Sequence, residues 1–133
     1  MVVLKPRLEV LKGPVIEVYT DFGPMDLHNH ADFKSLYYDT DDCVILTWKA
    51  FDTQEFKFDG RRVEKASLIF KGILQFSATP FDEEVPKIEN KNLEHLELFR
   101  DGGSIAGNFV FNNGTEVSIR SLDLDLEIDL YLK

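Results

Sequence analysis

The stretch Leu122-Asp123-Leu124-Asp125-Leu126-Glu127-Ile128-Asp129-Leu130-Tyr131-Leu132 alternates strictly between aliphatic and polar or aromatic side chains. In an extended strand, successive side chains point to opposite faces, so this stretch has one apolar face and one largely acidic face. A helix with the same sequence would spread Leu and Asp over every side and would have no apolar stripe to bury. The stretch therefore predicts a β-strand, and we expect all six of its aliphatic side chains to be buried.

Similar alternation recurs along the chain, and short segments rich in Gly, Asn and Asp separate the alternating runs. Asp59-Gly60 is the strongest turn signal, because both central residues of a type I′ turn need positive φ. We predict one all-β domain over residues 1–133, mainly antiparallel, forming a sandwich or barrel of about 8–10 strands with at most short helices. The expected strands cover residues 2–4, 8–11, 15–19, 43–51, 54–58, 62–79, 93–100, 104–111, 116–120 and 122–132.

The apolar positions change parity near Arg120-Ser121. Val117 and Ile119 are odd-numbered, whereas the aliphatic residues from Leu122 onward are even-numbered. A one-residue slip moves every side chain to the other face of a sheet, so we expect a bulge, bend or tight turn at this point. Gly72 lies within the longest alternating run and predicts a second irregularity.

The charge balance excludes some partners. The chain has 24 acidic and 15 basic residues and a formal net charge of −9, which would repel a nucleic-acid backbone. No apolar run is long enough for a signal peptide or a membrane span. Cys43 is the only cysteine and cannot form an internal disulfide. We therefore expect a cytoplasmic protein with neither a nucleic-acid nor a membrane partner.

The polar face of the closing stretch carries four carboxylates, which we call the acidic ladder: Asp123, Asp125, Glu127 and Asp129. Neighbours on one strand face lie roughly 7 Å apart, whereas Ca²⁺ ligands converge to about 2.3–2.6 Å from the ion, so a Ca²⁺ site does not fit. One hypothesis is that the ladder binds a basic protein partner. The other is that it forms a solvated face, paired across strands with lysines, namely Lys57, Lys65 and Lys71.

A metal site is a further hypothesis. Asp26, His28, His30 and Asp32 are spaced by two, so an extended segment places them on one face, and imidazole with carboxylate suits zinc, iron, manganese or nickel. The same spacing of two histidines occurs in cupin barrels, but the chain lacks the Glu and the glycine-flanked third histidine of that family. A metal-dependent enzyme using Asp26, His28 and His30 is therefore one alternative. No other catalytic set stands out, and we expect no cofactor.

Two segments, Val44-Ile45-Leu46-Thr47-Trp48 and Ala66-Ser67-Leu68-Ile69-Phe70-Lys71-Gly72-Ile73, resemble the central strands of small bacterial immunity-like proteins and other small all-β proteins. The resemblance implies a non-enzymatic protein that docks a partner, and the acidic ladder favours a basic one. An unpaired edge strand could also join two copies as a homodimer.

An alternative is a lipocalin-like or fatty-acid-binding-like barrel that carries a small apolar ligand. Six phenylalanines at inward-facing positions would line its interior, although a filled core needs the same side chains: Phe56, Phe58, Phe70, Phe76, Phe109 and Phe111.

Overall fold

The computed structural model describes residues 2–9, 14–15, 17–27, 31–40, 42–50, 56–79, 93–112 and 114–132, and every regular element among them is a β-strand. The strands are β1 (Val2–Leu4), β2 (Leu8–Glu9), β3 (Pro14–Val15), β4 (Glu17–Thr20), β5 (Gly23–Asp26), β6 (Ala31–Asp39), β7 (Cys43–Ala50), β8 (Lys57–Phe58), β9 (Arg61–Ala78), β10 (Leu93–Asp101), β11 (Ser104–Phe111) and β12 (Glu116–Leu130). The predicted all-β, antiparallel class is confirmed. The described strands outnumber the expectation for two reasons: the expected strand 15–19 is divided into β3 and β4, and β5 and β6 lie where no strand was predicted.

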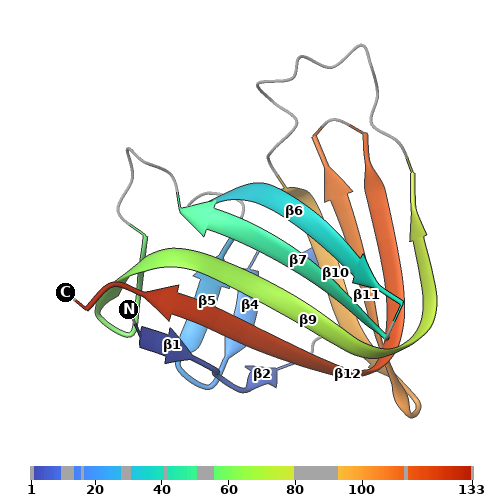
Figure 1. The fold of residues 1–133 in the computed structure, drawn as a ribbon, viewed down its shortest axis with the longest axis horizontal. Coiled ribbons are helices and arrows are strands. Elements are labelled where there is room, and N and C mark those ends of the chain that lie inside the picture. The colour runs from blue at the N-terminus through green and yellow to red at the C-terminus, as the bar shows by residue number, and fades with distance from the viewer. Residues whose placement is uncertain are drawn as a thin grey trace.

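Most of these strands belong to one nine-stranded sheet with the order β3-β10-β11-β12-β9-β7-β6, to which β1 adds beside β12 and β8 beside β9. A second sheet has the order β2-β4-β5. Figure 1 shows β9 and β12 running side by side across the molecule, with β6 and β7 on one side of them and β10 and β11 behind. Within the described residues the end strands β3 and β6 are not paired with each other, so the large sheet does not close into a barrel.

The long strands β9 and β12 bend together. Gly72 in β9 has φ +68°, and a side chain there would meet the Leu122 Cβ at 3.0 Å. The register between β9 and β12 shifts between Arg120 and Ser121. Both irregularities predicted from the sequence are therefore confirmed, and they occur at one place. The bend divides the large sheet into two arms, one containing β6 and β7 and the other containing β10 and β11.

Asp42, in the turn between β6 and β7, holds the bend in place. Its φ is 100°. The Asp42 carbonyl accepts a hydrogen bond from the Gly72 N–H at 3.0 Å, and its Oδ1 accepts one from the Ile73 N–H at 2.7 Å. The pairing of β7 with β9 ends just before these contacts, at Cys43 opposite Lys71.

Side chains from the two arms meet in the interior. The Trp48 ring of β7 lies 6.1 Å from the Phe109 ring of β11, and the Phe70 ring of β9 lies 6.0 Å from Phe109 in an edge-on arrangement. Gly107 leaves room for Phe70, since a Cβ at Gly107 would lie 3.0 Å from the Phe70 ring. The inner faces of the two arms therefore share one hydrophobic core. Buried residues of the small sheet and the turn after it, Val18, Met25 and Leu27, extend the same core.

The closing stretch is a strand, as predicted, but it joins residues 116–120 to form the single strand β12. Leu124, Leu126, Ile128 and Leu130 are buried. Leu122 is 60% exposed and Leu132 is 68% exposed, so the expectation that all six aliphatic side chains are buried is wrong at both ends. Leu122 lies at the bend opposite Gly72, and Leu132 lies beyond the last residue of the strand.

Other local expectations can now be compared with the structure. Asp59 and Gly60 have φ values of 53° and 75°, which fits the predicted type I′ turn. Five of the six phenylalanines of the carrier hypothesis are buried in the core, and Phe76 is half-buried. The carrier hypothesis stays a prediction, because these side chains also fill an ordinary core. Among the described residues there is no helix with the length and apolarity that a membrane crossing requires.

Candidate functional site

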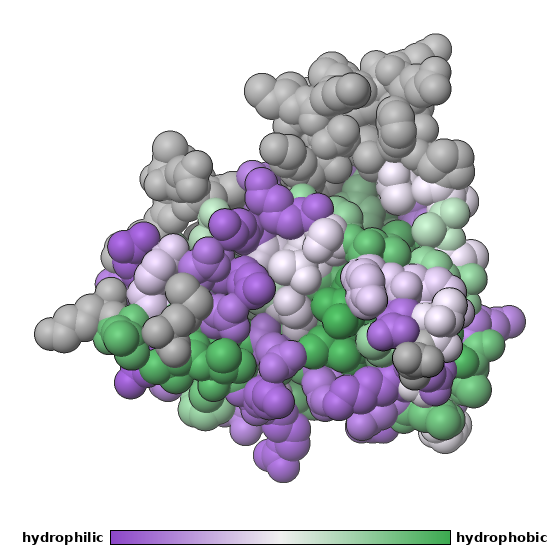
Figure 2. Space-filling view, in the orientation of Figure 1, coloured by the Kyte–Doolittle hydropathy of each residue, from purple (hydrophilic) through white to green (hydrophobic). Residues whose placement is uncertain are grey.

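The acidic ladder lies on the outer face of the arm that contains β6 and β7. In the antiparallel register, Asp123 is opposite Lys71 and Asp129 is opposite Lys65, as the cross-strand hypothesis expects. Lys57 is not opposite the ladder, because β8 pairs with the start of β9 at Arg61 and Arg62. Figure 2 shows hydrophilic and hydrophobic side chains interspersed on one face of the molecule.

Three of the four ladder carboxylates have a lysine ammonium beside them. Lys65 Nζ lies 3.7 Å from Asp129 Oδ2, Lys5 Nζ lies 3.6 Å from Glu127 Oε1, and Lys71 Nζ contacts Asp125 Oδ2. The hydrogen bond and the negative charge of Asp125 raise the pKa of Lys71 above its ordinary value. These solvated pairs contribute little to stability, but they neutralise much of the charge that a basic partner would need.

Asp123, the fourth carboxylate of the ladder, borders a charged cleft of about 290 Å³. It lies where β12 passes from its pairing with β11, which ends at Ser121, to its pairing with β1, which begins at Ile128. Asp123 and Asp125 share this cleft with three basic residues of the same chain, Lys5, Arg7 and Arg100. The ladder thus meets basic groups of its own chain here as well.

The predicted metal site is only partly visible. His28 and His30 lie outside the described residues, so their convergence stays a prediction. Asp26 is the last residue of β5, and Asp32 pairs with Lys49 between β6 and β7. The described ranges contain no group of three or more His, Cys, Asp or Glu residues that could hold a metal ion.

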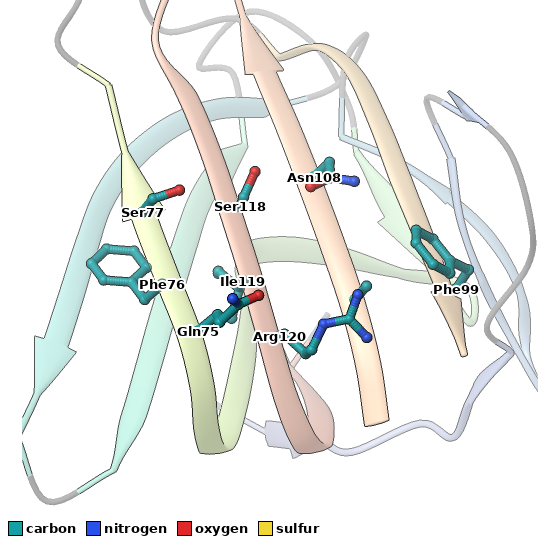
Figure 3. Close-up of a pocket in the computed structure, with 9 residues that line it drawn as sticks. Gln75, Phe76, Ser77, Phe99, Asn108, Ser118, Ile119 and Arg120 are labelled. Atoms are coloured by element: carbon teal, nitrogen blue, oxygen red, sulfur yellow. The ribbon is translucent and has the colours of Figure 1, made fainter. Parts of the chain in front are cut away.

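A larger cleft, of about 430 Å³, lies on the arm that contains β10 and β11. Its polar side chains form rows across the strands, with Ser77 opposite Ser118 and Gln75 opposite Arg120. Figure 3 shows these rows and places Phe99 on the far strand, β10. The described residues that line it are Gln75, Phe76, Ser77, Phe99, Ala106, Asn108, Ser118, Ile119 and Arg120.

The polar groups of this cleft are partly engaged within the chain. Arg120 Nη1 donates hydrogen bonds to Asp101 Oδ2 and to Ser104 Oγ, both at 2.9 Å. Asn108 Nδ2 donates to Glu97 Oε1 at 3.1 Å. The described lining residues include no His, Cys, Asp or Glu. Their hydroxyl, amide and guanidinium groups can accept or donate hydrogen bonds to a polar ligand.

One edge of this cleft is a strand edge that has no strand partner among the described residues. β9 pairs with β12 as far as Ala78, but with β7 only as far as Lys71. On the β7 side, no described strand pairs with residues 74–78, which we call the free edge. Leu74 in the free edge is 52% exposed. Phe76 is half-buried, and its ring lies 5.2 Å from that of the exposed Tyr38.

The sequence around the free edge contains a signal that the sequence analysis missed. Residues 72–79 read Gly-Ile-Leu-Gln-Phe-Ser-Ala-Thr, with neither a charged residue nor a proline, in a chain that is 29% charged. Edge strands are usually protected from further pairing by charges, prolines or bulges. The alternation of side chains predicts a strand here but does not show which strand edges are left unpaired.

Comparisons with known protein families, with curated proteins and with solved structures found no match for this chain.

Proposed function

We propose that this chain is a non-enzymatic interaction protein that binds an extended segment of a partner along the free edge of β9. The observation that carries the proposal is the uncharged run of residues 72–79, whose residues 74–78 lack a described strand partner on one side. Successive peptide groups of a strand point to opposite edges, so part of the N–H and C=O groups of residues 74–78 face outward. An added strand would satisfy them, as it does in other cases of strand addition.

The cleft beside the free edge would supply selectivity. Gln75 and Ser77 belong both to the free edge and to the cleft lining. A segment paired with β9 would therefore place alternate side chains next to these polar groups, while its other side chains lie toward Phe76 and Tyr38. The aromatic pair and the exposed Leu74 favour an apolar, uncharged segment over a charged one.

Binding of a peptide tests this proposal. The probe is a fluorescein-labelled peptide with the sequence of residues 72–79, extended by two lysines for solubility, and the control peptide has proline in place of the phenylalanine. The protein variants are Leu74→Lys, which puts a charge on the free edge, and Val3→Lys, which alters a residue of similar exposure, 55%, on β1. Fluorescence anisotropy should show binding to the unmodified chain and to Val3→Lys, and weak binding to Leu74→Lys. Two results would contradict the proposal: binding of the peptide to Leu74→Lys as tightly as to Val3→Lys, or equal binding of the two peptides to the unmodified chain.

A second candidate is docking of a basic protein partner through the acidic ladder (Asp123, Asp125, Glu127 and Asp129), as the resemblance to immunity-like proteins implies. The net charge of −9 and the exposure of Asp123 favour it. A lysine-rich peptide is a suitable probe, because binding by charge should weaken strongly as salt rises from about 0.05 to 0.5 M. Binding that is insensitive to salt, or that is unchanged in Asp123→Asn, would argue against this candidate.

We also propose a cytosolic compartment for the chain. Its support is Cys43, which is a free cysteine and only partly exposed.

A further inference from the structure

We propose that the segment which adds to the free edge is the same segment of a second copy of this chain, so that the protein forms a two-fold dimer through β9. This inference rests on the proposed function, since it names the partner for the same edge. A two-fold axis pairs identical strands antiparallel and repeats every contact twice. If the axis passes between the Phe76 residues of the two copies, the middle residues of the two free edges, Leu74 lies opposite Ala78 of the second copy and Gln75 lies opposite its Ser77.

Charge favours a second copy at this edge more than elsewhere. With a net charge of −9, two copies repel each other over most of their surfaces. The eight residues 72–79 carry no charge, so two such edges can approach without opposing carboxylates. Each copy of the chain therefore carries, in its own residues 72–79, an uncharged segment that can pair with the free edge of another copy.

Other strand edges in the described part of the chain have the features that block pairing. β6 contains Asp32, Lys34 and Asp39. β1 has only three residues and is followed by Lys5-Pro6, and β5 contains Pro24. Short length, charge and proline each discourage the addition of a strand. By comparison the free edge is longer than β1 and has none of these features.

The proposed dimer would also cover exposed apolar side chains. Tyr38 is 50% exposed and lies on β6 near the start of the free edge, where its ring lies 5.2 Å from that of Phe76. In the antiparallel arrangement the Phe76 side chains of the two copies become cross-strand neighbours, and Leu74 packs beside Ala78. The large sheets of the two copies would then form one continuous sheet, with their two polar clefts on the same face and Gln75 beside Ser77 of the second copy.

Sedimentation equilibrium over a wide range of protein concentrations tests the dimer. We expect the unmodified chain and Val3→Lys to associate to dimers with the same affinity, and Leu74→Lys to associate at least about tenfold more weakly. A chain that stays monomeric at every concentration would overturn the inference, and so would a dimer whose affinity Leu74→Lys leaves unchanged. The peptide experiment is independent, because a monomeric chain that still binds the peptide would retain the proposed function and lose only the self-partner.

Disulfide formation tests the register. Every variant carries Cys43→Ser, so that the native thiol does not interfere, and Gln75→Cys and Ser77→Cys are made separately because both positions are exposed. Directly opposed residues of antiparallel strands have Cα atoms about 4.5–5.5 Å apart, which a disulfide can bridge. Under mild oxidation a mixture of the two variants should form a covalent dimer much faster than either variant alone. If the mixture forms the covalent dimer no faster than each variant alone, the register centred on Phe76 is wrong.

Discussion

At the scale of single residues, Gly72 allows the bend on which the two arms of the sheet depend. Its φ of +68° is costly for any residue with a side chain, and a Cβ would also press on Leu122 at 3.0 Å. We expect Gly72→Ala to lower the free energy of unfolding by about 1–3 kcal/mol, measured by urea denaturation.

Gly103→Ala is the matched control for this substitution, because a Cβ there meets nothing within 4 Å. We expect Gly103→Ala to change stability by less than about 0.5 kcal/mol. Equal stability of Gly72→Ala and the unmodified chain would show that the bend does not need the glycine. If the double variant Gly72→Ala/Leu122→Ala has a higher free energy of unfolding than Gly72→Ala, the difference measures the part of the destabilisation that comes from the clash with Leu122.

Lys71 gives a prediction about pH. Its pKa is raised above the ordinary 10.5 because Asp125 hydrogen-bonds to the ammonium and carries an opposite charge. A raised lysine pKa contributes stability that is fully present below the unfolded value and is lost as pH rises through the folded value. Above about pH 10.5 the unmodified chain should therefore lose stability more steeply than Asp125→Asn, as followed by urea midpoints. Parallel alkaline profiles would contradict this role of Asp125.

At the scale of elements, β12 shows how far alternation alone predicts structure. Its period of two indicated a strand with an apolar face, and the change of parity placed an irregularity at Arg120-Ser121, where the register shift occurs. The burial of Leu122 was wrongly expected because alternation assigns a face but does not show where a sheet bends away from its core. Lys65 and Lys71 were placed correctly across from the ladder, whereas the position of Lys57 depended on a pairing that the sequence does not encode locally.

The candidate site was less predictable than the strands. The acidic ladder was visible as a pattern, but the pairing of Glu127 with Lys5 joins residues far apart in sequence. The free edge results from the β7–β9 pairing stopping at Cys43 opposite Lys71, so its position depends on the lengths of two strands and on the hydrogen bonds that Asp42 accepts from β9. The lack of charge in residues 72–79 is visible in the sequence, but only the sheet topology shows that part of this run lacks a described strand partner on one side.

A comparison within β12 tests the assignment of its faces. Leu126 is buried in the core, whereas Leu122 is mostly exposed at the bend. We expect Leu126→Ala to cost about 2–5 kcal/mol of unfolding free energy, and Leu122→Ala to cost less than about 1 kcal/mol. Chemical denaturation followed by circular dichroism measures both. Similar costs for the two substitutions would mean that the strand does not present its even positions to the core as described.

At the scale of the whole molecule, one core connects the two arms of the bent sheet. Trp48 on one arm contacts Phe109 on the other, so the only tryptophan reports directly on the packing between them. We expect Trp48 fluorescence and far-ultraviolet circular dichroism to give the same unfolding midpoint in urea, as for a cooperative domain. Two separated midpoints would show that the arms unfold independently.

The central claim is that the free edge of β9 is the surface through which this protein binds, and that a second copy occupies it. Amide hydrogen exchange of residues 74–78, resolved by nuclear magnetic resonance at low and high protein concentration, tests the claim directly. In dilute solution the amides that face β12 should be protected, whereas those that face outward should exchange fast. On concentration the fast amides should slow at least about tenfold, and residues 65–71, which are already paired on both sides, should not change. Outward amides that exchange at the same rate at both concentrations would contradict the claim.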